Sequence, residues 1–287
     1  MDSGKRPFTF ITNPVSGKNK EKVLEKIKEF LKENSGEIIY TEYQGHATEI
    51  AKHSIKKGQV PVAVGGDGTV NEVAYATSGT GFEFGIIPAG SGNAVAGHFN
   101  IPNDTKAALE TLKKGEIKKA DTGRINDTFF TMSTGVGFDA MVTEKMAERE
   151  KRGFFAYTEI VLKAWKERRA IPIRFVADGQ EYQTEAFMFT VANTSQFGNG
   201  VYIAPEADSN DGKLDIVVIE PFPYRAFLSL VAEARGFKKR SPYIKRYTAS
   251  HIEIDCDENL INLDGESKTI KMPATIKTTP ADIKIIC

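Results

Sequence analysis

Apolar and polar positions alternate in two different ways along the chain. Up to about residue 120, short apolar runs alternate with segments in which apolar side chains recur every three or four residues, the spacing of one helix face. The expected strands here are 8–12, 38–41, 60–64 and 84–87, and the expected helices are 20–34, 48–57, 70–77 and 106–113. Strands that alternate with helices predict a parallel sheet covered by helices on both faces.

Beyond residue 120 the pattern is mostly that of strands separated by Gly, Asn and Asp turns. The expected strands are 129–133, 173–177, 187–191, 214–219, 251–255, 260–263 and 270–278, with helical insertions at 139–169 and 224–235. This pattern predicts a second, mostly antiparallel β domain. We place the first domain at 1–124 and the second at 125–278, and we expect the segment 279–287 to return to the first domain.

Composition narrows the class of protein. In 287 residues, 38 Lys and Arg balance 38 Asp and Glu, which argues against a dedicated nucleic-acid binder because such proteins are strongly basic. The two cysteines, Cys256 and Cys287, lack the spacing of a disulfide scaffold or a zinc site and fit a reducing compartment. The sequence shows neither the apolar core of a signal peptide nor the roughly 18 apolar residues of a membrane-spanning helix. We therefore expect a soluble, cytoplasmic protein.

The strongest chemical signal is the run Gly-Gly-Asp-Gly-Thr-Val-Asn-Glu-Val at 65–73, which follows an apolar strand and opens a helix. Glycines allow the backbone to approach a phosphate closely, and the N–H groups at a helix N-terminus bind anions. Asp67 lies in this turn, where a carboxylate can orient a metal-bound water. The alternative is an ordinary turn with an aspartate cap, but the length of the run favours a functional loop.

Two further loops follow expected strands. Asn-Pro-Val-Ser-Gly-Lys at 13–18 comes after the first strand, and Pro-Ala-Gly-Ser-Gly-Asn at 88–93 comes after the fourth. The first of them is not a P-loop, because it lacks the upstream glycine and the final Ser or Thr. Each alone is typical of a turn. In a parallel sheet, however, the loops at the carboxyl ends of the strands share one edge, where ligands bind. Together the three loops predict a phosphate-binding site.

These motifs, in this order, resemble those of the diacylglycerol kinase catalytic-domain superfamily, which includes bacterial diacylglycerol and related lipid kinases and the sphingosine and ceramide kinases. The resemblance covers nearly the whole chain. Further matching positions are Asp121, the run Gly-Val-Gly-Phe-Asp-Ala at 135–140, Asn193, residues 204–215 and Asp-Gly-Glu at 264–266. The resemblance implies a Rossmann-like α/β nucleotide domain joined to an antiparallel β-sandwich with helical insertions, similar to NAD kinase, with the active site in the cleft.

The resemblance also implies the ligands of ATP and Mg²⁺. Contacts with ATP are expected from Asn13, Ser16, Gly17, Thr41, Gly65, Gly66, Asp67, Gly68, Thr69, Val70, Asn71, Glu72, Gly90, Ser91 and Asn93. The 208–213 segment is expected to hold Mg²⁺ through Asp208, Asp211 and the carbonyl of Lys213. Carboxylates are suitable ligands for this ion, although Asp211-Gly212 alone is typical of a hairpin turn.

The Asp-Gly-Glu segment is implied to supply the base that removes the proton from the lipid hydroxyl. We assign this role to Glu266 first, with Asp264 beside it, and we include Asp67 among the catalytic residues. Phosphoryl transfer depends mainly on positioning and charge neutralisation, which such a set of carboxylates suits. The alternative for Asp264-Gly265 is a simple turn between the 260–263 strand and the next strand.

One departure from the family pattern concerns the substrate. Typical bacterial diacylglycerol kinases carry Asp directly after the Asn of the third loop, whereas here Asn93 is followed by Ala94, which resembles the sphingosine and ceramide kinases. The 65–72 loop, in contrast, is of the bacterial type. Diacylglycerol and a sphingoid base or ceramide therefore both remain candidate substrates.

The stretch from Arg235 to Tyr247 contains six basic residues, three aromatic residues and no acidic residue. Basic and aromatic side chains favour the surface of an anionic membrane, where a lipid kinase must find its substrate. A solvated basic loop is the alternative. We expect transient membrane association through this stretch, no nucleic-acid partner and, by analogy only, a homodimer.

The sequence thus predicts an ATP- and Mg²⁺-dependent lipid kinase that phosphorylates the hydroxyl of diacylglycerol or a related lipid. Two other classes remain: a soluble kinase of the NAD kinase type, which shares the Gly-Gly-Asp-Gly turn, and a non-catalytic sensor of lipid or nucleotide. The Asn-Pro-x-Ser-Gly loop and the late Asp-Gly-Glu favour the lipid enzymes. The set of Asp67, Asp208, Asp211 and Glu266 argues against a sensor.

Overall fold

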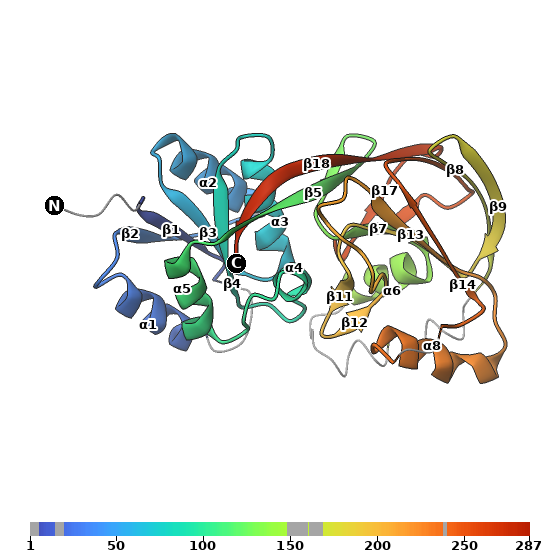
Figure 1. Ribbon diagram of the computed structural model, residues 1–287, viewed down its shortest axis with the longest axis horizontal. Helices are drawn as coiled ribbons and strands as arrows, with labels where there is room; N and C mark the ends of the chain where they lie inside the picture. Colours follow the sequence, from blue (N-terminus) through green and yellow to red (C-terminus); the bar gives the residue numbers. More distant parts are fainter. Residues whose placement is uncertain (1–5, 15–19, 148–159, 161–168, 238–239) are drawn as a thin grey trace. The chain divides into compact units, whose positions relative to one another are not determined.

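Figure 1 shows the computed structural model of the chain, which describes residues 6–14, 20–147, 160, 169–237 and 240–287. The chain divides into two compact units. The N-terminal unit comprises Met1–Ala120 and Ala281–Cys287, and the β unit comprises Asp121–Pro280. The division falls at 120/121 and 280/281, a few residues from the predicted 124/125 and 278/279.

The N-terminal unit is built on a parallel sheet with the strand order β2-β1-β3-β4. Its strands are β1 (Phe8–Thr12), β2 (Gly36–Tyr40), β3 (Val60–Gly65) and β4 (Glu83–Pro88). Every residue of β1, β3 and β4 is buried, as expected for continuous apolar strands covered on both faces. The last strand, β18 (Ala274–Ile286), ends against β4 through Lys284 and Ile285. The C-terminus therefore belongs to this unit.

The helices of this unit follow the strands, as the alternating pattern predicts. They are α1 (Lys20–Phe30), α2 (His46–Lys56), α3 (Asp67–Thr77), α4 (Ala94–His98) and α5 (Thr105–Lys114). Helix α1 packs with α5, and α2 packs with α3. Helix α3 begins at Asp67, three residues before the predicted 70, because the extended Gly66 leads directly from β3 into the helix.

The β unit contains a six-stranded antiparallel sheet with the order β14-β13-β10-β7-β16-β17. Its strands are β7 (Ser133–Gly137), β10 (Met188–Ala192), β13 (Leu214–Ile219), β14 (Ile244–Ala249), β16 (Leu260–Leu263) and β17 (Glu266–Thr269).

A second layer in the β unit is formed by β18, β15 (His251–Asp255), β8 (Ile171–Ala177) and β9 (Gln180–Ala186), with β5 (Ile117–Ile125) paired to β18 and β6 (Thr128–Phe130) paired to β5. Side chains from both layers share one core, in which Phe175 of β8 packs against Phe189 of β10. The predicted β-sandwich is confirmed.

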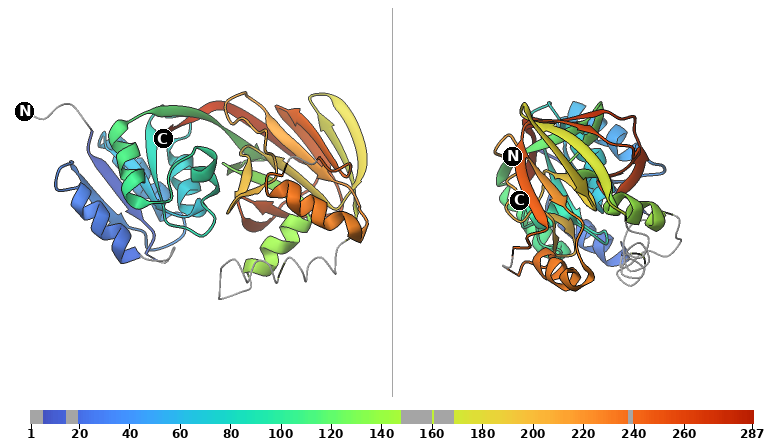
Figure 2. Two further views of the ribbon diagram at one scale, coloured as in Figure 1. Left: turned by 60° about the horizontal axis from the view of Figure 1, so that its bottom comes forward. Right: turned by 90° about the vertical axis from the view of Figure 1, so that its right-hand side faces the viewer.

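Shorter elements complete the β unit. They are α6 (Phe138–Ala147), the two-stranded β11 (Gln196–Gly198) and β12 (Val201–Tyr202), the 3₁₀ turn η1 (Tyr224–Ala226) and α8 (Phe227–Ala234). Figure 2 shows α6 and α8 from two further directions. Most of the predicted helical insertion at 139–169 lies outside the described residues. Among the residues that are described, no helix is both long and apolar enough to cross a membrane.

One expected strand is wrong in an informative way. The sequence predicts a single strand over 129–133, but β6 ends at Phe130 and β7 begins at Ser133. The N–H groups of Thr131 and Met132 donate to the carboxylate of Asp264 instead of to a neighbouring strand. The break is therefore caused by a side chain that lies more than 130 residues further along the chain.

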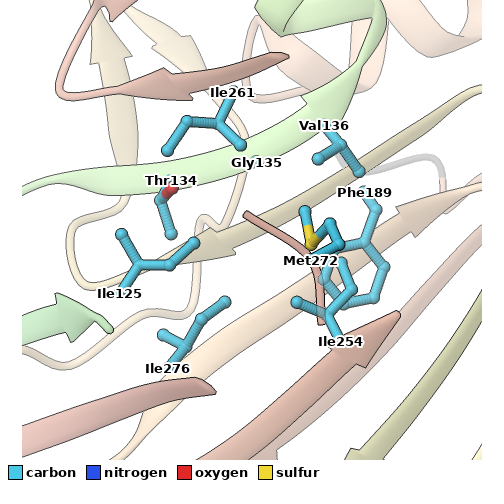
Figure 3. A pocket seen from close by; sticks show the side chains of 9 residues that line it. All are labelled: Ile125, Thr134, Gly135, Val136, Phe189, Ile254, Ile261, Met272 and Ile276. Carbon is cyan, nitrogen blue, oxygen red and sulfur yellow. The ribbon is translucent and has the colours of Figure 1, made fainter. Parts of the chain in front are cut away.

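The sandwich core lines a small pocket of about 10 Å³, room for about one water molecule (Figure 3). Its lining is apolar apart from Thr134, and includes Ile125, Phe189 and Met272. The buried hydroxyl of Thr134 has no hydrogen-bond partner among the described residues. A buried polar group without a partner lowers the stability of the fold.

We expect Thr134→Val to stabilise the protein. Valine has nearly the same shape, so the substitution removes the desolvated hydroxyl without opening a larger cavity. The expected gain in the free energy of unfolding is about 1 kcal/mol, measured by urea denaturation. The matched control is Thr190→Val, which removes an equally buried hydroxyl that donates to Asp139 at 3.0 Å and should destabilise. Equal losses in the two variants would contradict this interpretation.

Candidate functional site

Two of the three glycine-containing loops begin side by side in the N-terminal unit. Strand β3 ends at Gly65 and β4 at Pro88, and these two residues are paired across the parallel strands. The N–H of Ala89 donates to the carbonyl of Gly65 at 2.8 Å. The 65–72 and 88–93 loops therefore leave the sheet at the same edge, as the sequence predicts.

The two loops then approach so closely that only glycine fits. A Cβ atom on Gly90 would lie 2.3 Å from the Cα of Gly66, far inside van der Waals contact. Beyond this crossing, the N–H of Val95 donates to Oδ1 of Asp67 at 3.3 Å. Asn93 has a left-handed backbone, with φ of 51°, and its Oδ1 accepts from the N–H of Gly90 at 3.0 Å. The two predicted phosphate loops thus pack directly against each other and are joined by hydrogen bonds.

The ends of β1 and β2 lie at this edge as well. The N–H of Asn13 donates to the carbonyl of Val64 at 3.3 Å, and the N–H of Thr41 donates to the carbonyl of Thr12 at 3.0 Å. The structure therefore brings the predicted residues Asn13 and Thr41 to the edge that holds the glycine loops. The predicted residues Ser16 and Gly17 lie outside the described part of the chain.

Glu72 has a structural role that the sequence did not indicate. Its two carboxylate oxygens accept from the N–H groups of Gly45 and Ala47, each at 3.0 Å. These groups open helix α2, where a negative charge is favoured by the helix dipole and by the unpaired N–H groups. Thr48 adds a hydrogen bond from its hydroxyl to the Glu72 carbonyl at 2.9 Å. Because both carboxylate oxygens are engaged, the contacts of Glu72 give no support to its predicted role as an ATP ligand.

In the β unit, the carboxylate of Asp264 holds the backbone of 131–133. Its Oδ2 accepts from the N–H and the hydroxyl of Thr131, at 2.7 and 3.0 Å. Its Oδ1 accepts from the N–H groups of Met132 and Ser133, at 2.8 and 3.0 Å. Burial raises the pKa of the Asp264 carboxyl, and the hydrogen bonds from Thr131 and Ser133 oppose that effect. This carboxylate is an anchor for the chain.

Glu266 lies in a different environment, although it is only two residues away. Asp264 and Gly265 form the two-residue turn of the β16–β17 hairpin, and both have positive φ, 50° and 83°. Glu266 is exposed at the start of β17. Asn262 stabilises the turn, because its Oδ1 accepts from the N–H of Gly265 at 2.9 Å. The turn that the sequence allowed at Asp264-Gly265 is therefore present, and it separates the two acidic residues Asp264 and Glu266 into different environments.

Asn193 connects this turn to the predicted metal segment. Its Nδ2 donates to the carbonyls of Thr131 and Asp121, each at 2.9 Å. Asp121 in turn accepts from the N–H of Gly212 at 2.7 Å through its Oδ2, and its N–H donates to the carbonyl of Ser209. Asn193 and Asp121 are almost completely buried, with 3% and 1% exposure. A continuous hydrogen-bonded chain thus runs from Asp264 to the 208–213 segment.

The 208–213 segment forms tight turns closed by its own carboxylates. Oδ1 of Asp208 accepts from the N–H of Asn210 at 3.0 Å, and Oδ1 of Asp211 accepts from the N–H of Lys213 at 2.9 Å. Burial, together with the negative charges of Asp211, Glu206 and Asp208, raises the pKa of the nearby Asp215 to about 6.

This local accumulation of negative charge, with oxygen donors only, is suited to a hard divalent cation such as Mg²⁺. Within the described residues, no three His, Cys, Asp or Glu side chains are grouped so as to hold a metal. A cation here would therefore rely on Asp208, Asp211, the Lys213 carbonyl and water.

Asp139 and Asn262 are two residues whose contacts the sequence did not predict. Asp139, at the start of α6, accepts from the hydroxyl of Thr190 at 3.0 Å and from Nδ2 of Asn262 at 3.4 Å. Burial raises the pKa of Asp139 to about 6. The side-chain amide of Asn262 therefore links two groups, because its Nδ2 donates to Asp139 and its Oδ1 accepts from the N–H of Gly265. A carboxylate inside an apolar, glycine-rich run was the available signal for Asp139, whereas Asn262 had none.

Comparisons with known proteins show the family to which each part of the chain is similar. The family described as diacylglycerol kinase catalytic domain matches residues 7–125, and the family described as YegS C-terminal NAD kinase beta sandwich-like domain matches 132–287. A Mycobacterium tuberculosis protein named diacylglycerol kinase is 29% identical over 97% of this chain and 94% of its own length. An uncharacterised Synechocystis protein is 31% identical over 96% of this chain and 67% of its own length.

Among solved structures, a Bacillus anthracis protein described as a diacylglycerol kinase has a TM-score of 0.78 to this chain. The identity is 21%, and the likeness covers 99% of this chain and 98% of the other. At that identity it shows that the two proteins share a fold.

We expect Asp139 to make the stability of the protein decrease as the pH rises from about 4 to 6. Because its pKa is raised to about 6 in the folded state, the folded protein holds a proton that the unfolded chain releases near its ordinary pKa. The destabilisation is complete above pH 6 and amounts to at most about 3 kcal/mol. Asp139→Asn should remove it, so the wild-type minus variant difference in free energy of unfolding should fall across this interval. Parallel pH profiles would contradict the assignment.

Proposed function

The chain belongs to the diacylglycerol kinase family of lipid kinases, and on this premise we propose that it transfers the γ-phosphoryl group of ATP, with Mg²⁺, to the hydroxyl of diacylglycerol or a related lipid. The observation that carries this proposal is the chain of buried and partly buried hydrogen bonds from Asp264 through Thr131, Asn193 and Asp121 to Gly212. Burying polar groups is costly unless each finds a partner, and the buried Oδ1 of Asn193 has none among the described residues. A network of this extent, with the exposed Glu266 at one end and a cluster of carboxylates at the other, suits a catalytic site.

In this proposal the N-terminal unit binds the nucleotide. The crossing of Gly66 and Gly90 leaves two loops without side chains at the point where their backbones meet, and the first turn of α3 begins at the same place. Backbone N–H groups and a helix N-terminus are suitable donors to phosphate oxygens. Asn13, Thr41 and Ser91 are the polar residues that we assign to the nucleotide beside these loops.

Asp208 and Asp211, with the carbonyl of Lys213, are the proposed holders of Mg²⁺. The ion would neutralise negative charge that the transferred phosphoryl group brings to the site. The carboxylates supply the hard oxygen donors that this ion requires. Asp67, at the start of α3, is assigned to the orientation of a metal-bound water.

Glu266 is the proposed base that removes the proton from the lipid hydroxyl, and Asp264 is the proposed positioning residue. Glu266 is exposed, so its carboxylate is accessible to an incoming hydroxyl. Asp264 already accepts four hydrogen bonds from residues 131–133, and accepting a substrate proton would weaken them. In this proposal Glu266 therefore takes part in the chemistry, and Asp264 holds the backbone of 131–133 in place.

The lipid is proposed to come from a membrane surface, and its class stays open between diacylglycerol and a sphingoid base or ceramide. Ala94, where the bacterial family pattern has Asp, is completely buried at the start of α4, so no carboxylate is available at this position. The second candidate function is a soluble kinase of the NAD kinase type, because the matched C-terminal family is described as NAD kinase-like.

The decisive experiment measures ATP consumption with Mg²⁺ and a panel of acceptors: dispersed diacylglycerol, ceramide, a sphingoid base and NAD. Formation of a phosphorylated lipid is the expected result. Phosphorylation of NAD without any lipid product would replace the proposal by the second candidate. Tight nucleotide binding without turnover on any acceptor would indicate a sensor.

We expect Glu266→Gln to lower kcat by roughly 10²–10⁴-fold, since it removes general base catalysis. ATP binding and the thermal midpoint should stay close to those of the wild type, because the exposed side chain is replaced by one of the same shape. Both can be followed by calorimetry. The comparison variant is Asp264→Asn, which should lower the thermal midpoint because an amide cannot accept all four hydrogen bonds. An active Glu266→Gln together with a folded, inactive Asp264→Asn would reverse the two roles.

We expect Gly90→Ala to weaken nucleotide binding selectively. The added methyl group would meet the backbone of Gly66, so the two loops must separate. The KM for ATP should rise roughly tenfold, which corresponds to about 1.4 kcal/mol, while the KM for the lipid stays the same. A folded variant with unchanged ATP affinity would remove these loops from the nucleotide site.

A further inference from the structure

Helix α8 is apolar on two neighbouring sides, about 100° apart around its axis. Phe227 packs against a buried cluster that includes Phe187, Met188 and Val217, and Leu230 is 8% exposed. One position after each of these residues, Leu228 is 77% exposed and Val231 is 42% exposed. In Figures 1 and 2, α8 lies along the margin of the β unit. The inner side belongs to the core, while the outer side presents apolar side chains to solvent.

Aromatic side chains extend the exposed apolar face beyond both ends of the helix. Tyr224 precedes α8 and is 67% exposed, and Phe237 follows it and is 68% exposed. Four of the eight exposed large hydrophobic residues in the described part of the chain thus fall within 224–237. Scattered exposed apolar residues are normal, but a group of this kind indicates an interaction surface.

The charge of this face is wholly positive. Arg225 and Arg235 are exposed on it, whereas Glu233, the one acidic residue between 224 and 237, is buried. Oε2 of Glu233 accepts from the N–H of Ser241 at 2.6 Å, and its Oε1 pairs with Arg246 at 2.7 Å. The outer side therefore combines apolar, aromatic and basic side chains, and it presents no acidic side chain.

The basic stretch that follows is less available than its sequence indicates. Arg240 pairs with Glu206, Lys245 lies 3.6 Å from Glu220, and Arg246 pairs with Glu233. Lys238 and Lys239 lie outside the described residues. Ion pairs of this kind offset the charges that were expected to attract an anionic membrane through the stretch from Arg235 to Tyr247. The exposed apolar face of α8 is the stronger feature.

The chemistry of this face matches an anionic bilayer. Apolar side chains enter the boundary between headgroups and acyl chains, aromatic residues favour that depth, and arginine favours anionic headgroups. A second copy of the chain is a poorer match, because an eight-residue helix offers little of the roughly 800 Å² that each partner contributes to a stable interface. Two symmetric copies would also bring their arginines together.

We propose that α8 and its flanks, residues 224–237, dock the protein on an anionic membrane by inserting Leu228, Val231 and the two flanking aromatic side chains into the interfacial layer. This inference rests on the proposed function in one respect, because it supplies the route by which the enzyme reaches a lipid substrate. The docking itself involves no chemistry and can be measured without turnover.

The experiment measures co-sedimentation of the full chain with vesicles of phosphatidylcholine alone and of phosphatidylcholine with phosphatidylserine. The wild type should bind the anionic vesicles. The double variant Leu228→Glu and Val231→Glu should lose at least tenfold in the partition coefficient. Arg225→Gln should lose about fivefold on anionic vesicles only. The matched control is Ile117→Glu, which changes a 50% exposed apolar residue in the N-terminal unit and should bind like the wild type.

Activity distinguishes failure of the docking inference from failure of the proposed function. On a short-chain, water-soluble diacylglycerol the double variant should retain wild-type turnover, and on vesicle-borne lipid it should lose it. Wild-type vesicle binding by the double variant, or equal loss in Ile117→Glu, would overturn the docking role of α8. The docking role would also be overturned if the wild type does not bind vesicles but forms a dimer, and the double variant is a monomer. Absence of lipid phosphorylation with intact vesicle binding would overturn the proposed function alone.

Discussion

The carboxylate of Asp264 is the interaction on which the arrangement of the β unit depends. It takes up the backbone N–H groups of 131–133, which would otherwise continue a strand, and so it separates β6 from β7. A buried N–H group without an acceptor costs about 1–3 kcal/mol, so this single side chain supports a large part of the local geometry. The position of the β16–β17 turn and the start of β7 follow from it together.

The carbonyl side of the same segment is held by Asn193, which extends the arrangement to Asp121 and the 208–213 turns. Opposite groups of one short backbone segment are thus bound by two side chains, Asp264 in the β16–β17 turn and Asn193 directly after β10. Asp139 and Asn262 hold the turn from its other side. These contacts give the acidic residues distinct roles, because burial and hydrogen bonding differ between neighbours such as Asp264 and Glu266.

The N-terminal unit is organised by a different constraint, the absence of side chains. The two loops meet at Gly66 and Gly90, where a Cβ on Gly90 would collide with the Gly66 backbone, and the polar contacts of Asp67 and Asn93 then close the loops. Glu72 shows the limit of motif reading, since a residue inside the motif caps α2 through the N–H groups of Gly45 and Ala47. The place of Glu72 within the 65–73 run indicated a contact with phosphate, whereas the structure shows that its carboxylate contacts the start of α2.

What the sequence determined by itself was local: the period of apolar residues located β3, β4 and α1, and the order of glycine loops identified the family. Those features depend on residues close together in the chain. The break at 131–132, the burial of Asp264, the bridge through Asn262 and the outward face of α8 were decided only by the tertiary structure. Each depends on which distant groups meet, because hydrogen bonds and burial act between neighbours in space, and one sequence does not state which residues those are.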